Sequence, residues 1–310
     1  MGKVVAIVLL LCAAPAASQT LFERGPPESR IVHRALLALR LNPEGLIFDG
    51  RVGYRHRLYL NESRAMRDNF IGGGLGANAS PAFARVGPYV EFAPMSMVTL
   101  WAQFAFVSYF GGFDLLQSFP SPRSEYSDEE LERLGELDPP ENNYGAVGTE
   151  LTLGLDLQAR LGPVLVRSRG RFVRADLDIR EGDRVYYDQL FDVLAADGGW
   201  MFANDLDVAW MGLGNRLVLG LRYTATVPFY GDGYAPSEPR ENDNSHQRLG
   251  PLISYSFFTR DGAAFNAPSV FLLVQWWLDH RYRAGQEHSQ AMPLIGLGFQ
   301  FYGDLLPFDD

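Results

Sequence analysis

The chain has 310 residues, of which 47% are hydrophobic, and a formal net charge of −10. The negative charge argues against nucleic acid as a partner. The sequence after the first residues contains no apolar run of about 18 residues, so it predicts no transmembrane helix. Its single cysteine is Cys12, which leaves the rest of the chain without disulfide or thiol chemistry.

The first residues have the pattern of an export signal. A basic start at Lys3 precedes an almost wholly apolar stretch, which ends in small residues at Ser18. This pattern is typical of a secretory signal peptide, and the stretch is too short for a membrane-spanning helix. Cys12 raises a lipoprotein alternative, but Leu11 stands where a small residue is normally required. We therefore expect a signal peptide at 1–18 and export by the general secretory route.

Alternating apolar and polar residues run through the rest of the chain. The pattern is clearest at 149–161, where each odd position from Leu151 is apolar and each even position from Glu150 is polar or glycine. Side chains alternate across a β-strand with period two, so this segment has one apolar and one polar face. Further strands are predicted, in chain order, at 31–41, 46–60, 70–78, 84–93, 97–110, 163–175, 200–211, 215–228, 248–258, 269–282 and 293–302.

The connections between these strands alternate in length. Short ones lie at 94–97, 162–163 and 212–215, with a medium one at 260–268, whereas long ones lie at 111–146, 177–198, 229–247 and 283–291. Short turns at one end and long loops at the other are typical of an up-and-down antiparallel barrel that crosses a membrane. Counting back from the last strand gives about twelve strands with both chain ends at the short-turn end. That count needs a short outer connection near 79–83 and a longer inner one at 61–69, so ten or fourteen strands remain alternatives.

The lengths of the strands separate a membrane barrel from a soluble β-sandwich. Sandwich strands usually have about five or six residues, whereas most segments here last long enough to meet the ~9–11 residues of a tilted membrane strand. The apolar faces carry mostly Leu, Val, Phe and Trp, and the opposite faces carry Arg, Asp, Glu and Gln. A membrane barrel turns its apolar face to lipid and its polar face to the lumen, and its sheet must close because lipid offers no hydrogen bonds to the backbone.

With this alternation, loop asymmetry and signal, and a last strand that ends Phe299-Gln300-Phe301, the chain resembles the outer-membrane β-barrel proteins of Gram-negative bacteria. The resemblance covers 31–302 and is to an architecture, with no motif that identifies a subfamily. It implies a barrel domain at 19–302 in the bacterial outer membrane. Members commonly end on an aromatic residue, whereas here a short tail at 303–310 is expected to follow. The implied partners are outer-membrane lipid, lipopolysaccharide, the barrel-assembly machinery and small solutes.

The polar faces of the strands predict which residues line the lumen. The candidates are Arg51, Arg55, Arg57, Arg85, Glu91, Glu150, Asp156, Arg160, Arg167, Arg169, Arg171, Arg222 and Asp279. Rings of charged side chains select solutes in pores, and the arginines of 167–171 are the best candidates to attract anions. The alternative is a static network of Arg–carboxylate pairs that fills a narrow interior.

The outer loops contain two further candidate sites. The loop 123–142 is acidic, and Ser127 and Glu130 have the spacing of a capping box at the start of a short helix. Its carboxylates could bind Ca²⁺, but their spacing matches no EF-hand loop, so a solvated acidic face is the favoured interpretation. Ser245-His246 and His288-Ser289 could supply a nucleophile and a base. The remaining histidines are scattered, so we expect no metal site, and no motif indicates a cofactor.

Three functions follow from these observations. The first is a narrow, porin-like channel or transport protein with a charged lumen. The second is a closed structural or surface-interaction barrel that works through its long acidic outer loops. The third is a lipid-modifying outer-membrane enzyme, for which the loop Ser and His residues are the only candidates, so the sequence leaves the question of catalysis open.

Overall fold

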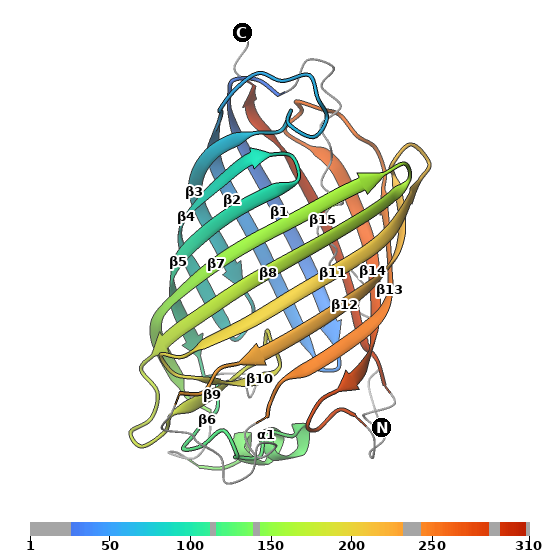
Figure 1. Cartoon of the computed structure of the whole chain (residues 1–310). Helices are drawn as coiled ribbons and strands as arrows, with labels where there is room; N and C mark the ends of the chain where they lie inside the picture. Colours follow the sequence, from blue (N-terminus) through green and yellow to red (C-terminus); the bar gives the residue numbers. More distant parts are fainter. Residues whose placement is uncertain (1–25, 112–115, 139–142, 232–242, 285–291, 308–310) are drawn as a thin grey trace.

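The computed structural model describes residues 26–111, 116–138, 143–231, 243–284 and 292–307. Twelve strands form one closed antiparallel barrel in which each strand pairs with its sequence neighbours and the first pairs with the last (Figure 1). The strands are β1 (Ser29–Leu41), β2 (Gly45–Arg57), β3 (Phe70–Ala79), β4 (Phe83–Met95), β5 (Val98–Phe110), β7 (Gly145–Leu161), β8 (Val164–Leu177), β11 (Trp200–Gly212), β12 (Leu217–Pro228), β13 (His246–Ser256), β14 (Asn266–Asp279) and β15 (Leu294–Pro307). This confirms the predicted fold and the count of twelve.

The connections lie at the two ends as the sequence requires. The short connection at 80–82 joins β3 to β4 at the end that also carries the long connections after β5, β8, β12 and β14, which we call the long-loop end. The longer connection at 58–69 joins β2 to β3 at the opposite, short-turn end, where β1 begins and β15 ends. The two features on which the strand count depended are therefore both present.

The outer wall of the barrel is apolar. On β7, Leu153, Leu155 and Leu157 are about two-fifths exposed (41%, 40% and 42%), whereas Thr152, which faces inward, is 7% exposed. Large apolar side chains are exposed in the same way on the other strands, among them Phe48, Leu75, Val90, Phe106, Val166, Leu221, Ile253 and Trp276. A soluble monomer rarely exposes an apolar surface beyond a few hundred Å². A closed sheet with this exterior is the architecture of outer-membrane proteins.

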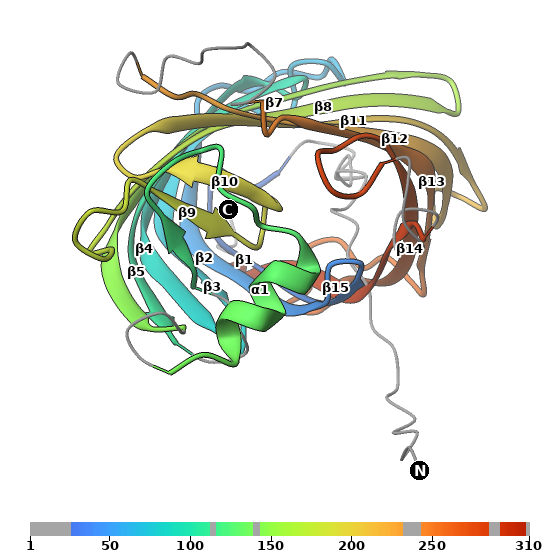
Figure 2. The ribbon, with the colours of Figure 1, turned by 90° about the horizontal axis from the view of Figure 1, so that it is seen from below.

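The barrel opening at the long-loop end is covered by further elements of the chain. Three short strands, β6 (Ser118–Phe119), β9 (Val185–Asp188) and β10 (Val193–Ala196), form a second sheet in the order β10-β9-β6. This sheet and the helix α1 (Asp128–Gly135) lie across the barrel opening when it is viewed from the long-loop end (Figure 2). Within the described residues, no helix has both the length and the apolar character needed to cross a bilayer.

Two details of the wall differ from the predictions. The strand β15 continues to Pro307, where it pairs with Arg30, so most of the expected tail 303–310 belongs to the barrel wall. Asp279 is exposed, whereas the sequence placed it in the lumen. The reason is a bulge, because Gln247 pairs with Asp279 but the next residue, Arg248, pairs with Trp277. An extra residue in one strand resets the alternation of its side chains.

The lipid-facing role of β7 can be tested with an arginine. The Leu153→Arg variant should lose about 2–4 kcal/mol of folding stability, because the charge would lie near the middle of the bilayer. Leu161→Arg is the matched control, since Leu161 is 86% exposed beside the turn at the short-turn end and a charge there should cost about 0–1 kcal/mol. Urea titration of folding into lipid bilayers measures both. Equal losses in the two variants would contradict the membrane orientation.

Candidate functional site

The hairpin formed by β9 and β10 fills the lumen at the long-loop end with a packed apolar core. On one face, Tyr186, Phe191 and Val193 pack against inward side chains of the wall such as Val107 and Val173. On the other face, Val185, Tyr187 and Leu194 pack with side chains from the segment that carries α1, namely Phe119, Tyr126 and Leu131. Both faces of the hairpin are therefore buried, and we refer to residues 185–196 as the plug hairpin.

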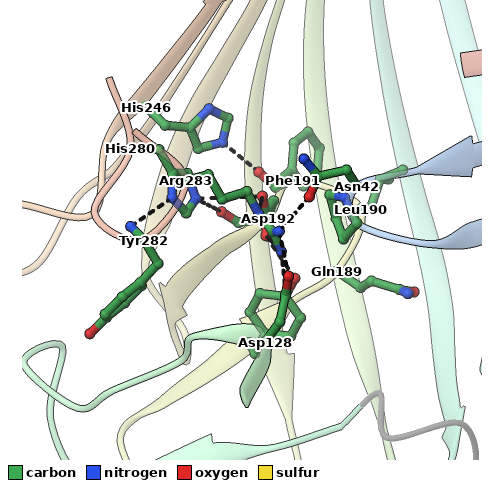
Figure 3. A network of polar contacts seen from close by, with 12 residues as sticks. Asn42, Asp128, Gln189, Leu190, Phe191, Asp192, His246, His280, Tyr282 and Arg283 are labelled. Atoms are coloured by element: carbon green, nitrogen blue, oxygen red, sulfur yellow. Dashed lines mark hydrogen bonds and ion pairs between the residues drawn. The ribbon is translucent and has the colours of Figure 1, made fainter. Parts of the chain in front are cut away.

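The tip of the plug hairpin, at 189–192, is held by polar contacts from several parts of the wall (Figure 3). On the β1 side, Arg40 donates to the carbonyl oxygens of Gln189 (2.7 Å) and Leu190 (3.1 Å). On the β13 side, the carbonyl oxygen of Phe191 lies 2.6 Å from Nε2 of His246. Each of these backbone groups would otherwise be buried without a partner, which is costly. The contacts therefore fix the tip in one position.

Asp192 is the centre of this network. Its carboxylate is 1% exposed, accepts hydrogen bonds from Arg283 (2.8 Å) and the Tyr187 hydroxyl (2.7 Å), and lies 3.4 Å from Nε2 of His280. Arg283 also donates to Asp128 of α1 (2.7 Å) and to Asn42 (2.8 Å). One guanidinium thus joins the plug hairpin, the helix α1 and the connection between β1 and β2.

The electrostatics of Asp192 favour its charged form. Burial by itself would raise the pKa of this carboxyl, but the charge of Arg283, followed by that of His280 and hydrogen bonds from both, holds the pKa well below its usual range. The pKa of Tyr187 is raised well above its ordinary value, chiefly by burial and then by the neighbouring Asp192 charge. The network is therefore an ion pair between Asp192 and Arg283 with a neutral tyrosine donor.

A second anchor joins the plug hairpin to the opposite wall. Asp188 is 0% exposed and its carboxylate lies 3.1 Å from Arg85 of β4, which also lies 3.3 Å from Glu150 of β7. Arg85 further donates to the hydroxyl of Tyr109 on β5. Asp188 of the plug hairpin therefore completes a charged cluster whose other members belong to the wall.

Charged side chains also pair between neighbouring strands along the lumen wall. Asp207 of β11 is 1% exposed and accepts hydrogen bonds from Arg167 (2.6 Å) and Arg222 (2.6 Å), one on each neighbouring strand. Asp205, two residues earlier, lies 3.3 Å from Arg169 and 3.5 Å from Arg171. These contacts are the static network that the sequence offered as the alternative to an open charged ring.

A cavity of about 310 Å³ lies inside the barrel at the short-turn end. Its wall comes from the short-turn halves of the strands and from the connections at 58–69, 96–97 and 257–265, and it includes six arginines and five carboxylates. The arginines are Arg30, Arg34, Arg51, Arg55, Arg167 and Arg169, and the carboxylates are Asp68, Glu91, Asp156, Asp261 and Asp304. The lumen thus has a filled half and a hollow half.

The structure brings most of the nominated lumen residues inside the barrel. Arg51, Arg55, Glu91, Asp156, Arg167 and Arg169 line the cavity, while Arg85, Glu150, Arg171 and Arg222 take part in the charged contacts above it. Arg57 and Arg160 lie at the short-turn rim, where they donate to the carbonyl oxygens of Pro26 and Gly162. Asp279 is the member that the bulge in β14 removes from the lumen.

The candidate catalytic residues that are described do not form a nucleophile–base pair. The hydroxyl of Ser245 donates to Asp243, whereas the His246 ring is 1% exposed, binds the Phe191 carbonyl and packs edge-on against Trp277. His288 and Ser289 lie outside the described residues. No cluster of three or more His, Cys, Asp or Glu side chains that could bind a metal occurs in the described part of the chain.

The acidic loop forms the predicted helix. Ser127 caps α1 by accepting a hydrogen bond from the Glu130 backbone N–H at 3.3 Å. The side chain of Glu130 pairs with Arg133 (2.7 Å), where a full capping box would have it reach back to Ser127. Part of the acidic segment, 139–142, lies outside the described residues.

Sequence reasoning missed the plug hairpin, because it treated 177–198 as one long loop. A signal was present, since Val185-Tyr186-Tyr187 and Val193-Leu194-Ala195-Ala196 are too apolar for a solvated loop and flank the mixed segment 188–192. Two short apolar runs separated by five residues fit a hairpin with a longer loop. The sequence could not show that this hairpin folds inward, because only the packed wall supplies the partners.

Comparison with known proteins adds the context of the fold. No protein-family model and no curated protein matches the chain. Among solved structures, an outer-membrane channel from Pseudomonas putida F1 has 10% identity and a TM-score of 0.45, and covers 94% of this chain and 100% of that one. The β domain of the Bordetella autotransporter BrkA has 11% identity and a TM-score of 0.43, over 89% of this chain and 97% of that one. The closed barrel with its apolar exterior is the architecture of an outer-membrane β-barrel protein.

Substitution of Asp207 tests how much the charged network contributes to stability. Asp207→Asn should cost about 3–5 kcal/mol of stability, because it removes a buried carboxylate charge that accepts hydrogen bonds from the buried Arg167 and Arg222 side chains. Asp156→Asn is the matched control, since Asp156 lies on the cavity wall and makes no ion pair in the described residues; it should change stability little. Urea unfolding from detergent micelles measures both. A small effect of Asp207→Asn would show that the network does not hold the wall together.

The charge of Asp192 predicts a pH dependence. Because the pKa of Asp192 is lower when the plug hairpin is docked than the ~3.9 of a free carboxyl, its charge stabilises docking above about pH 4, and this contribution is lost as the pH falls further. Hydrogen–deuterium exchange of residues 185–196 should therefore be faster in Asp192→Asn than in the wild type by a factor that is constant from about pH 7 to 4 and shrinks below that. A difference that vanishes between pH 7 and 5 would contradict a depressed pKa.

Proposed function

We propose that this protein is a narrow channel of the outer membrane that is closed at rest, and that the plug hairpin is its gate. The observation that carries the proposal is the division of the lumen into a cavity at the short-turn end and a packed hairpin at the long-loop end. In this proposal a solute in the cavity crosses when the plug hairpin moves together with the β6 and α1 segment that packs on it.

The plug hairpin is the part of the interior that can move at least cost. Wall strands are hydrogen-bonded on both sides, and opening the wall in lipid would leave backbone groups without partners. The plug hairpin, by contrast, is bonded to itself and to β6, and it is held to the wall by side chains. Its release would expose the Asp188 and Asp192 anchors to water, where carboxylates are well solvated.

The charged pairs favour a narrow path for small solutes. Arginine side chains of β8 and β12 pair with Asp205 and Asp207 of the strand between them, β11, so charged groups line this part of the lumen wall. Charged groups at a constriction select solutes by charge and size. The proposal is therefore a selective channel or transport protein, in contrast to a wide general pore.

A closed barrel that acts through its outer loops is the second candidate. It is favoured by the apolar core that seals both faces of the plug hairpin and continues to Leu131 of α1. In that case the interior serves as a scaffold for the outer loops, and the plug hairpin stays in the lumen. The two candidates make opposite predictions for ion conduction.

Arg283 is the residue to change, since it joins the plug hairpin to α1 and to the connection after β1. In planar bilayers, wild-type protein should show rare, small conductance steps. Arg283→Ala should open more often, because it leaves Asp192 buried without its main counter-charge, at a cost of about 3–5 kcal/mol in the docked state.

Arg133→Ala is the matched control, because it also removes one arginine of an ion pair at the same end of the protein, but an exposed one. Exposed pairs contribute about 0–1 kcal/mol, so its conductance should equal that of the wild type. If folded Arg283→Ala protein is as silent as the wild type at every voltage, the channel proposal fails and the closed barrel is favoured.

A further inference from the structure

Arg51 differs from the other arginines that line the cavity. The remaining five each lie within ion-pair distance of a carboxylate, in the pairs Arg30–Asp304, Arg34–Asp49, Arg55–Glu91, Arg167–Asp207 and Arg169–Asp205. Among the described residues Arg51 has no such carboxylate, and its polar contact is the side-chain oxygen of Gln103 at 3.2 Å. A cation without a counter-charge on a cavity wall is a place where an anion gains most.

Two aromatic rings hold the Arg51 guanidinium in place. It lies 4.6 Å from the ring centre of Trp101 and 5.3 Å from that of Tyr89. Contacts of this kind stabilise a cation and fix the plane of the guanidinium. They occupy the faces of the group and leave its N–H edges, apart from the one bonded to Gln103, to donate to a ligand.

Glycines on β2, β3 and β7 make room for all three side chains around Arg51. A Cβ at Gly53 would lie 2.2 Å from the Tyr89 hydroxyl, and one at Gly154 would lie 2.0 Å from the Trp101 ring. A Cβ at Gly76 would lie 2.7 Å from the Gln103 amide. Each side chain therefore lies close against a glycine, and a Cβ at that position would displace it. The arrangement is a built site, because its geometry depends on three separate strands.

The chemistry of the site selects one class of ligand. The N–H fork of a guanidinium matches a carboxylate in geometry. Asp156 and the paired Glu91 line the same cavity, so a second negative charge on the ligand would be repelled. Phe70, Tyr89 and Trp101 supply apolar wall, and a volume of about 310 Å³ suits a small molecule.

We infer that the cavity binds small organic monocarboxylates with an apolar or aromatic body, with the carboxylate on Arg51 and the body against the aromatic wall. The inference rests on the proposed function in so far as it names the class of solute that the channel would take. The binding itself needs no conduction, so the two can be tested apart.

The test is calorimetric titration of the folded protein in detergent with benzoate as the probe. Benzamide has the same shape without the charge and serves as the matched ligand control. Arg51→Gln removes the charge, and Arg51→Lys keeps it but loses the fork. Arg216→Gln is the matched protein control, because Arg216 also lies over a tyrosine ring at the short-turn end but outside the cavity.

Benzoate should bind to the wild type and to Arg216→Gln with equal affinity, and at least about tenfold more weakly to Arg51→Gln, with Arg51→Lys in between. Benzamide should bind the wild type at least about tenfold more weakly than benzoate. SDS gel electrophoresis of unheated samples, in which a folded barrel resists unfolding, shows that each variant is folded. Equal binding of benzoate to folded Arg51→Gln, equal binding of the two ligands, or no saturable benzoate binding would overturn the inference.

The result is independent of conductance. If benzoate binds through Arg51 while Arg283→Ala remains silent in bilayers, the site stands and the channel proposal fails. If Arg283→Ala conducts but benzoate does not bind, the channel stands and this site is wrong.

Discussion

The need of every backbone amide for a hydrogen-bond partner in lipid determines the rest of this structure. It forces the twelve strands into a closed sheet, and closure divides each strand into a lipid face and a lumen face. Leu153, Leu155 and Leu157 can then lie outside, while the charged residues of the same strands must lie inside. Inside a narrow barrel those charges need partners, which is why Asp207 holds an arginine from each neighbouring strand.

The two halves of the lumen differ in how far protein side chains fill them. At the long-loop end the interior is filled by the plug hairpin, whose apolar faces pack like a soluble core and whose tip is held by Asp192 and Arg283. At the short-turn end no such insertion exists in the described residues, and a cavity remains. The closed state therefore depends on a few buried ionic contacts at one end, which makes it sensitive to single substitutions.

Most of the wall could be predicted from the sequence because its cause is local. Strict alternation at 149–161 is enough to assign both faces of β7, and loop lengths assign the ends of the barrel. The failures have non-local causes. The bulge opposite Gln247 moves Asp279 out of the lumen, the pairing of β15 with β1 extends the last strand, and the inward fold of 185–196 depends on partners from distant strands. The same holds for Arg51, whose isolation follows from where the carboxylates of other strands happen to lie.

The most direct test of the account is the reactivity of single thiols in the two halves, since Cys12 is the only natural cysteine. Thr99→Cys would place a thiol on the cavity wall, and Ala195→Cys would place one on the buried, wall-facing side of the plug hairpin. In detergent, a small water-soluble thiol reagent should modify Thr99→Cys quickly and Ala195→Cys only slowly. Applied to intact cells from outside, it should modify neither. Rapid modification of Ala195→Cys, or of Thr99→Cys from outside in otherwise wild-type protein, would contradict a lumen closed by the plug hairpin.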